Sequence, residues 1–392
     1  MNYRNALRKD NILRCIILFV FSAASILAYS QKEVTLLKKK KYEAVISLSA
    51  TDDPIQLLYK AEAYFYLQQD SLALLTYGQY EWCPKDTNDY HNYLFLLCQT
   101  EQWSTAQNLV RKIGVAPPWR SLDSLQKWKD EVVQFAISNS SFINSSGNES
   151  SPCFYPNGLL YSADKNRFKA KQSDFYWVRT DDNGSMIEKY RLSRSINSKA
   201  NELGIAYDIS SECLVFGRQE EGLSQLFRSK HINHLWTPSQ EFMLNDSAFS
   251  VHSPTISKDG KMFIFSSDMP GGMGGDDLYI CFKIDSNRWS KPMNLGKAIN
   301  TRMDEISPFL NENGALFFSS NGHIGYGGFD VYRTQFFRGV WMQPFNLRSP
   351  VNSCFDETYF VLSEERGRAY LSSNRPRGKG GFDIYRIDPK LD

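Results

Sequence analysis

The feature that most constrains the fold is a fivefold repeat of about 50 residues, which fills the chain from about residue 137 onward. Four copies open on an acidic residue, as at Glu305, whereas the third copy, around Val251, has diverged. Equivalent positions, 53, 49, 54 and 52 residues apart, are Pro152, Ile205, Pro254, Pro308 and Phe360. A period of this length indicates five copies of one supersecondary unit, each of which packs on its neighbours.

Each copy carries the same order of β-strand signals. An apolar segment leads into a turn such as Asn157-Gly158, and a second apolar segment follows. Asn-Gly turns are typical of tight hairpins. A long loop then precedes a third segment, as at residues 329–332, and a fourth follows a tryptophan, as at Trp341. A four-stranded unit of this length, repeated five times, predicts a five-bladed β-propeller.

The repeat also indicates how the ring closes. The fifth copy stops after its third strand signal, at about residue 387. Ile143-Asn144 precedes the first copy just as Ile299-Asn300 precedes the fourth. We therefore expect residues of about 136–144 to supply the missing outer strand of the last blade, which removes an open sheet edge.

The front third has a helical period instead. Apolar residues recur at three- and four-residue steps in residues 55–69, 71–82, 86–99 and 104–113. Ala44, Ala73 and Ala106 are 29 and 33 residues apart, a spacing that is similar to degenerate tetratricopeptide repeats. Two interpretations of this helical part stay open: a peptide-binding groove and a structural cap on the larger domain. The predicted fold class is α+β multidomain: TPR-like helical repeats over residues 31–135, then an all-β five-bladed propeller over residues 136–392.

Residues 1–30 have the pattern of a signal peptide. Arg4, Arg8 and Arg14 lie before an apolar stretch of residues 15–27, and small residues lead to Ser30. We expect cleavage after about Ser30 and export to the periplasm, where the outer membrane is one place of association. The six cysteines that remain form no Cys-x-x-Cys pair, so we expect them to be small buried residues rather than metal ligands. Whether any two of them form a disulfide is left open.

Support for catalysis is weak at the level of sequence. With 45 Lys+Arg against 43 Asp+Glu, no basic surplus indicates nucleic-acid binding. Carboxylates that recur in nearly every repeat are typical of turn and cap acceptors, whereas a catalytic group is needed once. Gly-x-Ser-x-Gly is absent, and residues 271–275 (GGMGG) precede a strand rather than a helix. We expect no enzyme, cofactor or metal. Carbohydrate binding or hydrolysis by the propeller is the alternative.

The repeats resemble a known family. The fourth copy reads Ser-Pro, then Phe-Phe-Ser-Ser-Asn at residues 317–321, Gly-Gly-Phe-Asp-x-Tyr at residues 327–332, and Trp-x-x-Pro-x-Asn-Leu at residues 341–347. This string is similar to the WD40-like, TolB-type propeller repeat. With the helical repeats and the signal peptide, the chain resembles the periplasmic TPR–propeller–OmpA-type proteins of the type IX secretion system of Bacteroidota.

The resemblance implies a scaffold or adaptor for protein–protein interactions in the cell envelope, linked to type IX secretion or outer-membrane assembly. Its partners would be envelope or outer-membrane proteins, and membrane association would come only through them. Those relatives continue into a carboxypeptidase-regulatory-like domain and an OmpA-like domain, whereas this sequence ends after the fifth repeat. Peptidoglycan binding is therefore not expected.

The candidate partner-binding face lies on the long loops between the second and third strands of repeats three to five. These loops carry side chains that the repeat does not share, and variable loops on a rigid scaffold are where binding residues concentrate. The candidates are Met269, Met273, His323, Tyr326, Arg375, Arg377 and Lys379.

Overall fold

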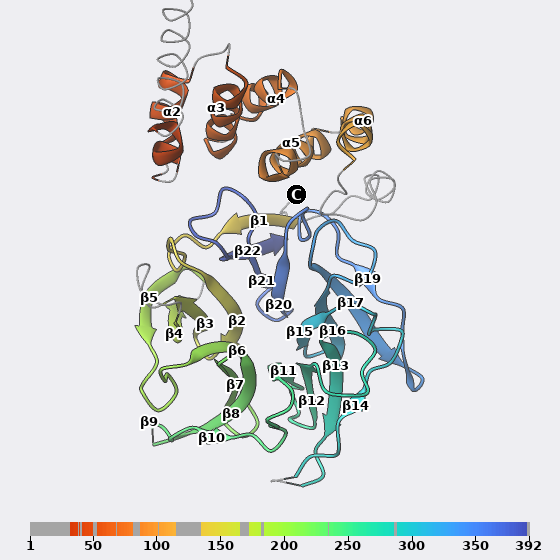
Figure 1. Ribbon diagram of the computed structural model, residues 1–392. Coiled ribbons are helices and arrows are strands. Elements are labelled where there is room, and N and C mark those ends of the chain that lie inside the picture. Colours follow the sequence, from red (N-terminus) through yellow and green to blue (C-terminus); the bar gives the residue numbers. More distant parts are fainter. Residues whose placement is uncertain are drawn as a thin grey trace, which may run out of the picture. The chain divides into compact units, whose positions relative to one another are not determined.

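The computed structural model describes residues 32–37, 39, 41–49, 53–67, 69–80, 87–100, 102–114, 135–164, 172–181, 184–233, 235–285 and 288–389 (Figure 1). The predicted signal peptide, residues 1–30, lies outside them. Contacts divide the chain into two compact units, residues 1–117 and 118–392. In the described part of the chain, no helix is both long and apolar enough to span a bilayer.

The first unit is helical, as its sequence period predicted. Its labelled helices are α2 (Tyr42–Leu48), α3 (Pro54–Tyr66), α4 (Asp70–Gly78), α5 (Thr87–Gln99) and α6 (Trp103–Ile113). α3 begins at a proline behind Asp53, whose side chain accepts the Ile55 N–H at 2.9 Å, and α6 ends at Gly114 in the left-handed conformation. The helices are confirmed, and their tetratricopeptide class stays a prediction.

Glu62 on α3 makes this unit sensitive to pH. Burial, to which the charge of Asp89 adds, raises the pKa of the Glu62 carboxyl to about 7. Because this folded-state pKa lies above the unfolded value, folding favours the protonated form, and stability is lost as pH rises toward and through 7. We expect Glu62→Gln to abolish a loss of about 2 kcal/mol between about pH 5 and about pH 8. Thermal melts followed by the helical circular dichroism signal measure this loss of stability. Glu43→Gln, at an exposed position of α2, is the control. An unchanged pH dependence after the Glu62→Gln substitution contradicts the assignment.

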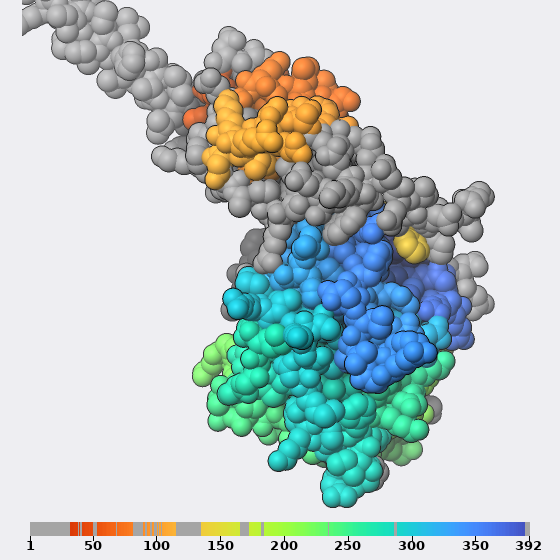
Figure 2. Space-filling view, turned by 90° about the vertical axis from the view of Figure 1, so that its right-hand side faces the viewer, coloured from red at the N-terminus to blue at the C-terminus, as the bar shows by residue number. Residues whose placement is uncertain are grey.

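The second unit contains five antiparallel sheets that stand as blades around one axis, so the five-bladed propeller is confirmed (Figure 1). Figure 2 shows the outer sides of blades three to five, coloured from turquoise to blue. Blades one and two contain β2 (Glu149–Tyr155), β3 (Gly158–Asp164), β4 (Ser173–Thr180) and β5 (Met186–Arg191), then β6 (Asn201–Asp208), β7 (Cys213–Glu220), β8 (Leu223–Ile232), β9 (Leu235–Trp236) and β10 (Gln240–Glu241). Blades three and four contain β11 (Val251–Ile256), β12 (Met262–Ser267), β13 (Asp277–Phe282) and β14 (Met293–Asn294), then β15 (Glu305–Leu310), β16 (Ala315–Ser320), β17 (Asp330–Phe337), β18 (Val340–Trp341) and β19 (Phe345–Asn346).

Blade five joins the two ends of the propeller sequence. It contains β20 (Glu357–Ser363), β21 (Arg368–Ser373) and β22 (Asp383–Pro389), and its outer strand is β1 (Phe135–Asn139). β1 pairs antiparallel with β22, with Ile137 opposite Ile387. The pairing covers residues 135–139, and residues 140–144 of the expected closing segment form the turn that follows.

The core lies between the blades rather than at the axis. Successive residues of one strand face opposite neighbours: Phe263 and Phe265 of β12 pack toward blade two, whereas Ile264 packs toward blade four. Five such buried clusters exist, one at each blade-to-blade interface, including the interface of blades five and one that contains Val361 and Leu159. This arrangement holds the blades in a closed ring.

Two blades differ from the expected four strands. β8 and β17 continue past the blade and fold back as short outer hairpins with β9 and β18. Trp236 and Trp341 lie in these added strands, and the expected fourth strands, β10 and β19, follow them. The added pairing comes from tight turns, such as Arg338-Gly339 with φ of 51° and 86°, which the sequence pattern did not reveal.

Candidate functional site

The axis of the propeller is lined by a bulge in the innermost strand of every blade. One residue at each bulge has a left-handed backbone: Ser151, Gly204, Ser253, Ser307 and Tyr359, with φ between 50° and 55°. A bulge re-aims the side chain of the extra residue. The Tyr359 hydroxyl of blade five lies 3.0 Å from the Ser253 Oγ of blade three, which are not neighbouring blades. This contact crosses the axis and closes the channel.

Blade three adds groups that no other blade repeats. Val251 takes the place of the glutamate, and the next residue, His252, places Nδ1 3.0 Å from Ser253 Oγ and Nε2 3.0 Å from Asp276 Oδ1. The hydrogen-bonded row Asp276–His252–Ser253–Tyr359 therefore fixes the cross-axis contact from one side. The sequence comparison of the blades marked this copy as diverged, and the structure gives the reason: a different polar row replaces the glutamate cap.

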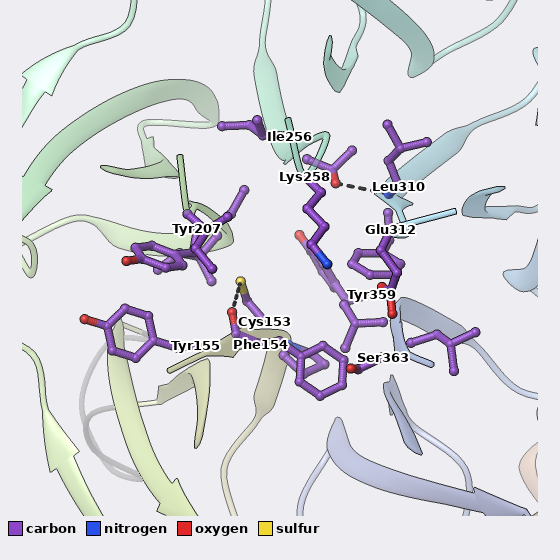
Figure 3. A pocket seen from close by; sticks show the side chains of 18 of the residues that line it. Cys153, Phe154, Tyr155, Tyr207, Ile256, Lys258, Leu310, Glu312, Tyr359 and Ser363 are labelled. Atoms are coloured by element: carbon purple, nitrogen blue, oxygen red, sulfur yellow. Dashed lines mark hydrogen bonds between the residues drawn. The ribbon is translucent and has the colours of Figure 1, made fainter. Parts of the chain in front are cut away.

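A funnel of about 390 Å³ opens on one side of this contact (Figure 3). Its walls are mainly apolar and come from the second half of the innermost strands, and Lys258 and Glu312 reach into it from two turns. The turn that supplies Glu312 is fixed, because Glu312 Oε1 accepts the Glu364 N–H at 3.0 Å. Lys258 is exposed and forms no ion pair with a carboxylate in the described part of the propeller.

The sequence analysis did not identify the funnel residues, although they occupy one equivalent position in each repeat. Each innermost strand has an apolar or aromatic side chain of varying size at one equivalent position. This position lies five residues after Glu149, Glu202, Val251, Glu305 and Glu357. These residues are Phe154, Tyr207, Ile256, Leu310 and Leu362, and all five line the funnel. Variation at one repeated position, rather than in the long loops, was the informative pattern.

The repeated glutamates are caps. Each accepts the backbone N–H of the residue four positions earlier, at 2.7–2.8 Å, and the hydroxyl of the same residue, at 2.6–2.8 Å; the pairs are Glu149–Ser145, Glu202–Ser198, Glu305–Thr301 and Glu357–Ser353. Burial raises the pKa of the carboxyls of Glu149, Glu202 and Glu305. Because these groups are occupied in nearly every blade, they serve the blade connections.

A second set of buried carboxylates fixes the long loops. Asp277 accepts the N–H groups of Met273 and Gly274, and Asp330 and Asp383 do the same at equivalent places. Burial raises the pKa of the Asp330 carboxyl well above its usual value. A side chain at Gly274 or Gly327 would collide with a backbone carbonyl of the next blade, so the Gly-rich loops are interblade contacts rather than anion cradles.

The candidate loop residues lie on the face opposite the funnel, and several of them bond to the fold through their side chains. Arg375 pairs with Glu357 at 3.0 Å and donates to the Val351 carbonyl at 2.7 Å. His323 Nε2 lies 2.7 Å from the Ile299 carbonyl. Arg218 of blade two donates to the Ile196 carbonyl at 2.6 Å, so different side chains satisfy one repeated architectural need. The reasoning that architecture makes no demand at these positions was therefore wrong for Arg375 and His323.

The other candidates vary in access. Met273 is exposed, whereas Met269 is half-buried against the core between blades two and three. Lys379 Nζ donates to the Ser141 carbonyl at 2.6 Å. Burial raises the pKa of the Tyr326 hydroxyl to about 12, and Arg377 has a left-handed φ of 70°. Partner binding by all seven loop candidates, Arg375 and His323 included, stays a prediction.

Within the described residues, no group of three or more His, Cys, Asp or Glu side chains is placed to hold a metal ion. Cys153, Cys213, Cys281 and Cys354 are buried, as the scattered cysteines predicted. Cys153 lines the funnel, but burial raises the pKa of its thiol to about 12, so it is a poor nucleophile.

Comparison with known proteins found solved structures that are similar to this chain in architecture. No protein-family model and no curated protein matches the chain. TolB from Acinetobacter baumannii is 13% identical with a TM-score of 0.38, over 62% of this chain and 55% of TolB. A GH62 α-L-arabinofuranosidase domain from Coprinopsis cinerea is 12% identical with a TM-score of 0.42, over 64% of this chain and 92% of that domain. A gluconolactonase from Xanthomonas campestris is 10% identical with a TM-score of 0.40, over 65% and 89%. These likenesses do not select a function.

Proposed function

We propose that the chain is a non-enzymatic, exported scaffold or adaptor of the cell envelope, with type IX secretion or outer-membrane assembly as its setting. The observation that carries the proposal is the funnel: an apolar hollow closed at its base by the Tyr359–Ser253 contact. The capped glutamates leave no free carboxylate pair of the kind that glycoside hydrolysis uses among the described blade entrances. Apolar pockets with a charged rim hold the anchor side chains of partner proteins.

The funnel suits one or a few apolar side chains of a protein segment. Phe154 and Tyr155 line one wall, and Ile256 and Leu310 line others. Lys258 at the rim offers a cation to an acidic residue beside the anchor (Figure 3). The proposal therefore assigns the partner to the funnel face, whereas the sequence analysis assigned it to the loop face, and variants on the two faces can be compared directly.

Recovery of partners from envelope fractions tests this. We expect Ile209→Asp and Lys258→Glu, both exposed residues of the funnel, to lower partner recovery at least tenfold, because anchor positions contribute most of the binding energy. Met273→Asp on the loop face is the matched control and should leave recovery unchanged. Loss of recovery only in the Met273 variant would return the site to the loop face.

Carbohydrate binding is the second candidate, because Tyr155 and Tyr207 form an edge-to-face pair, 4.8 Å between centroids, on the funnel wall. Aromatic faces of this kind can stack on sugar rings. Soluble oligosaccharide that competes with the partner for wild-type chain, but not for a Tyr207→Ser variant, would favour this candidate over the adaptor.

A further inference from the structure

The outer hairpin of blade four carries large apolar side chains that the blade does not need. β16 pairs with β17 only as far as Gln335. Beyond it, residues 336–345, here called the aromatic hairpin, turn at Arg338-Gly339 on the outer side of the ring (Figure 1). Its apolar side chains Phe336, Phe337, Val340, Met342 and Phe345 are 49–59% exposed. Exposed clusters of this kind mark interaction sites.

The segment that contains the aromatic hairpin carries charge of one sign, although Glu364 lines the same cleft as Arg333. Residues 331–352 contain Arg333, Arg338 and Arg348 and no Asp or Glu. Arg338 lies over the Phe337 ring, 5.1 Å from its centroid, and Arg348 lies over the Phe345 ring at 4.9 Å. Arg338 is exposed, so its pair with Phe337 combines positive charge with apolar surface. Nε and Nη1 of Arg348 are buried, so the pair with Phe345 contributes mainly apolar surface.

The neighbouring blade extends this surface. β13 ends at the same end of the propeller as β17, because the strand order and the antiparallel pairing repeat in each blade. Phe282 and Ile284 are exposed there by 42% and 60%. Lys283 and Lys291 flank them, and Asp285 is engaged by Arg288 at 2.6 Å. Figure 2 looks onto this side of the propeller, where blades three to five are coloured turquoise to blue.

The shape of the aromatic hairpin distinguishes between occupants. Phe336 and Phe337 are consecutive strand residues, so their side chains point to opposite faces of the hairpin. Both are about half exposed. A flat protein surface covers one face of a projecting hairpin, whereas the interface of a bilayer surrounds it.

We propose that the aromatic hairpin of blade four, with the adjoining end of blade three, docks the propeller on an anionic membrane surface. Aromatic side chains settle at the boundary of headgroups and acyl chains, and each nearby Arg or Lys adds electrostatic attraction to anionic lipids. The chain then contacts the bilayer itself, in contrast to the expectation that only its partners do. The observations that support this inference do not involve the funnel.

Vesicle co-sedimentation of the full chain tests the proposal. We expect binding to vesicles of phosphatidylcholine and phosphatidylglycerol in equal parts, and little binding to phosphatidylcholine alone. Phe336→Ser/Phe337→Ser should weaken binding at least tenfold. Arg338→Asp should weaken it about tenfold, and aspartate is chosen because it tolerates the left-handed backbone conformation of this turn. Added salt should weaken the binding further.

The matched control is Ile187→Ser/Tyr190→Ser on β5. These side chains are 41% and 47% exposed, but Glu188 and Lys189, of opposite charge, lie between them in the strand. This variant should bind as the wild type does, and melting curves of all variants establish that each is folded. Absence of binding by the wild type, or equal binding by the hairpin variants, overturns the proposal. Loss of protein capture with unchanged vesicle binding would reassign the hairpin to a protein partner.

Discussion

Replacement of Glu357 by valine is expected to lower the free energy of unfolding of the propeller by about 4 kcal/mol. Glu357 is fully buried and pairs with Arg375, whose side chain is only 12% exposed. It also accepts the Ser353 N–H at 2.7 Å and the Ser373 hydroxyl at 2.8 Å. The change leaves a buried cation without its counter-charge and buried donors without an acceptor, which costs more than the loss of the attraction alone. Urea unfolding followed by tryptophan fluorescence measures it.

Glu305 provides the matched control. It is equally buried and accepts from Thr301 and Ser320, but no guanidinium pairs with it in the described structure. Glu305→Val should therefore cost only about 2 kcal/mol, the penalty of unsatisfied polar donors. A Glu357→Val/Arg375→Met chain should recover part of the loss. Equal costs for the two single variants would mean that the cation is not stranded, and would contradict the structural role given to Arg375.

The blades could be predicted because their determinants are local and repeat. Turn residues such as Asn157-Gly158, runs of consecutive apolar residues as in β12 and the glutamate at each blade entrance recur in every copy or nearly so. A requirement that every blade has in common leaves a periodic mark, and its period identifies the fold. The same logic assigned the glutamates to caps, because a group needed by each blade is not a single catalytic group.

The candidate functional surface could not be predicted in the same way, because its contacts join segments far apart in the sequence. The partner of the Tyr359 hydroxyl is Ser253, 106 residues away. His323 and Arg375 differ in type, yet each serves a carbonyl of a blade connection, 24 residues away in both cases. Variation in type was interpreted as freedom from structure, whereas different donors can fill one role. Only the three-dimensional position separates these cases.

Closure of the ring depends on Asn144, and Asn144→Ala is expected to cost about 3 kcal/mol. Its side chain accepts the Ile384 N–H at 2.9 Å and donates to the Ile384 carbonyl at 2.8 Å. It also donates to Asn139 at the end of β1, at 3.0 Å. Alanine leaves two buried backbone groups of β22 unsatisfied and detaches the turn that follows the closing strand. Hydrogen exchange of the β22 amides should then become much faster.

Asn352 allows the effect of closure to be separated from the loss of two hydrogen bonds. It makes the same pair of bonds with Val331, at 2.8 and 2.9 Å, but joins residues 21 positions apart instead of 240. Asn352→Ala should lower the free energy of unfolding by a similar amount through the loss of these local hydrogen bonds, while the β22 amides stay protected from hydrogen exchange. In the Asn144 variant, exchange should spread over β1 and β22, because β1 is the edge strand of its sheet and pairs with β22 alone. Equal protection of β22 in both variants would show that β1 holds the last blade without this asparagine.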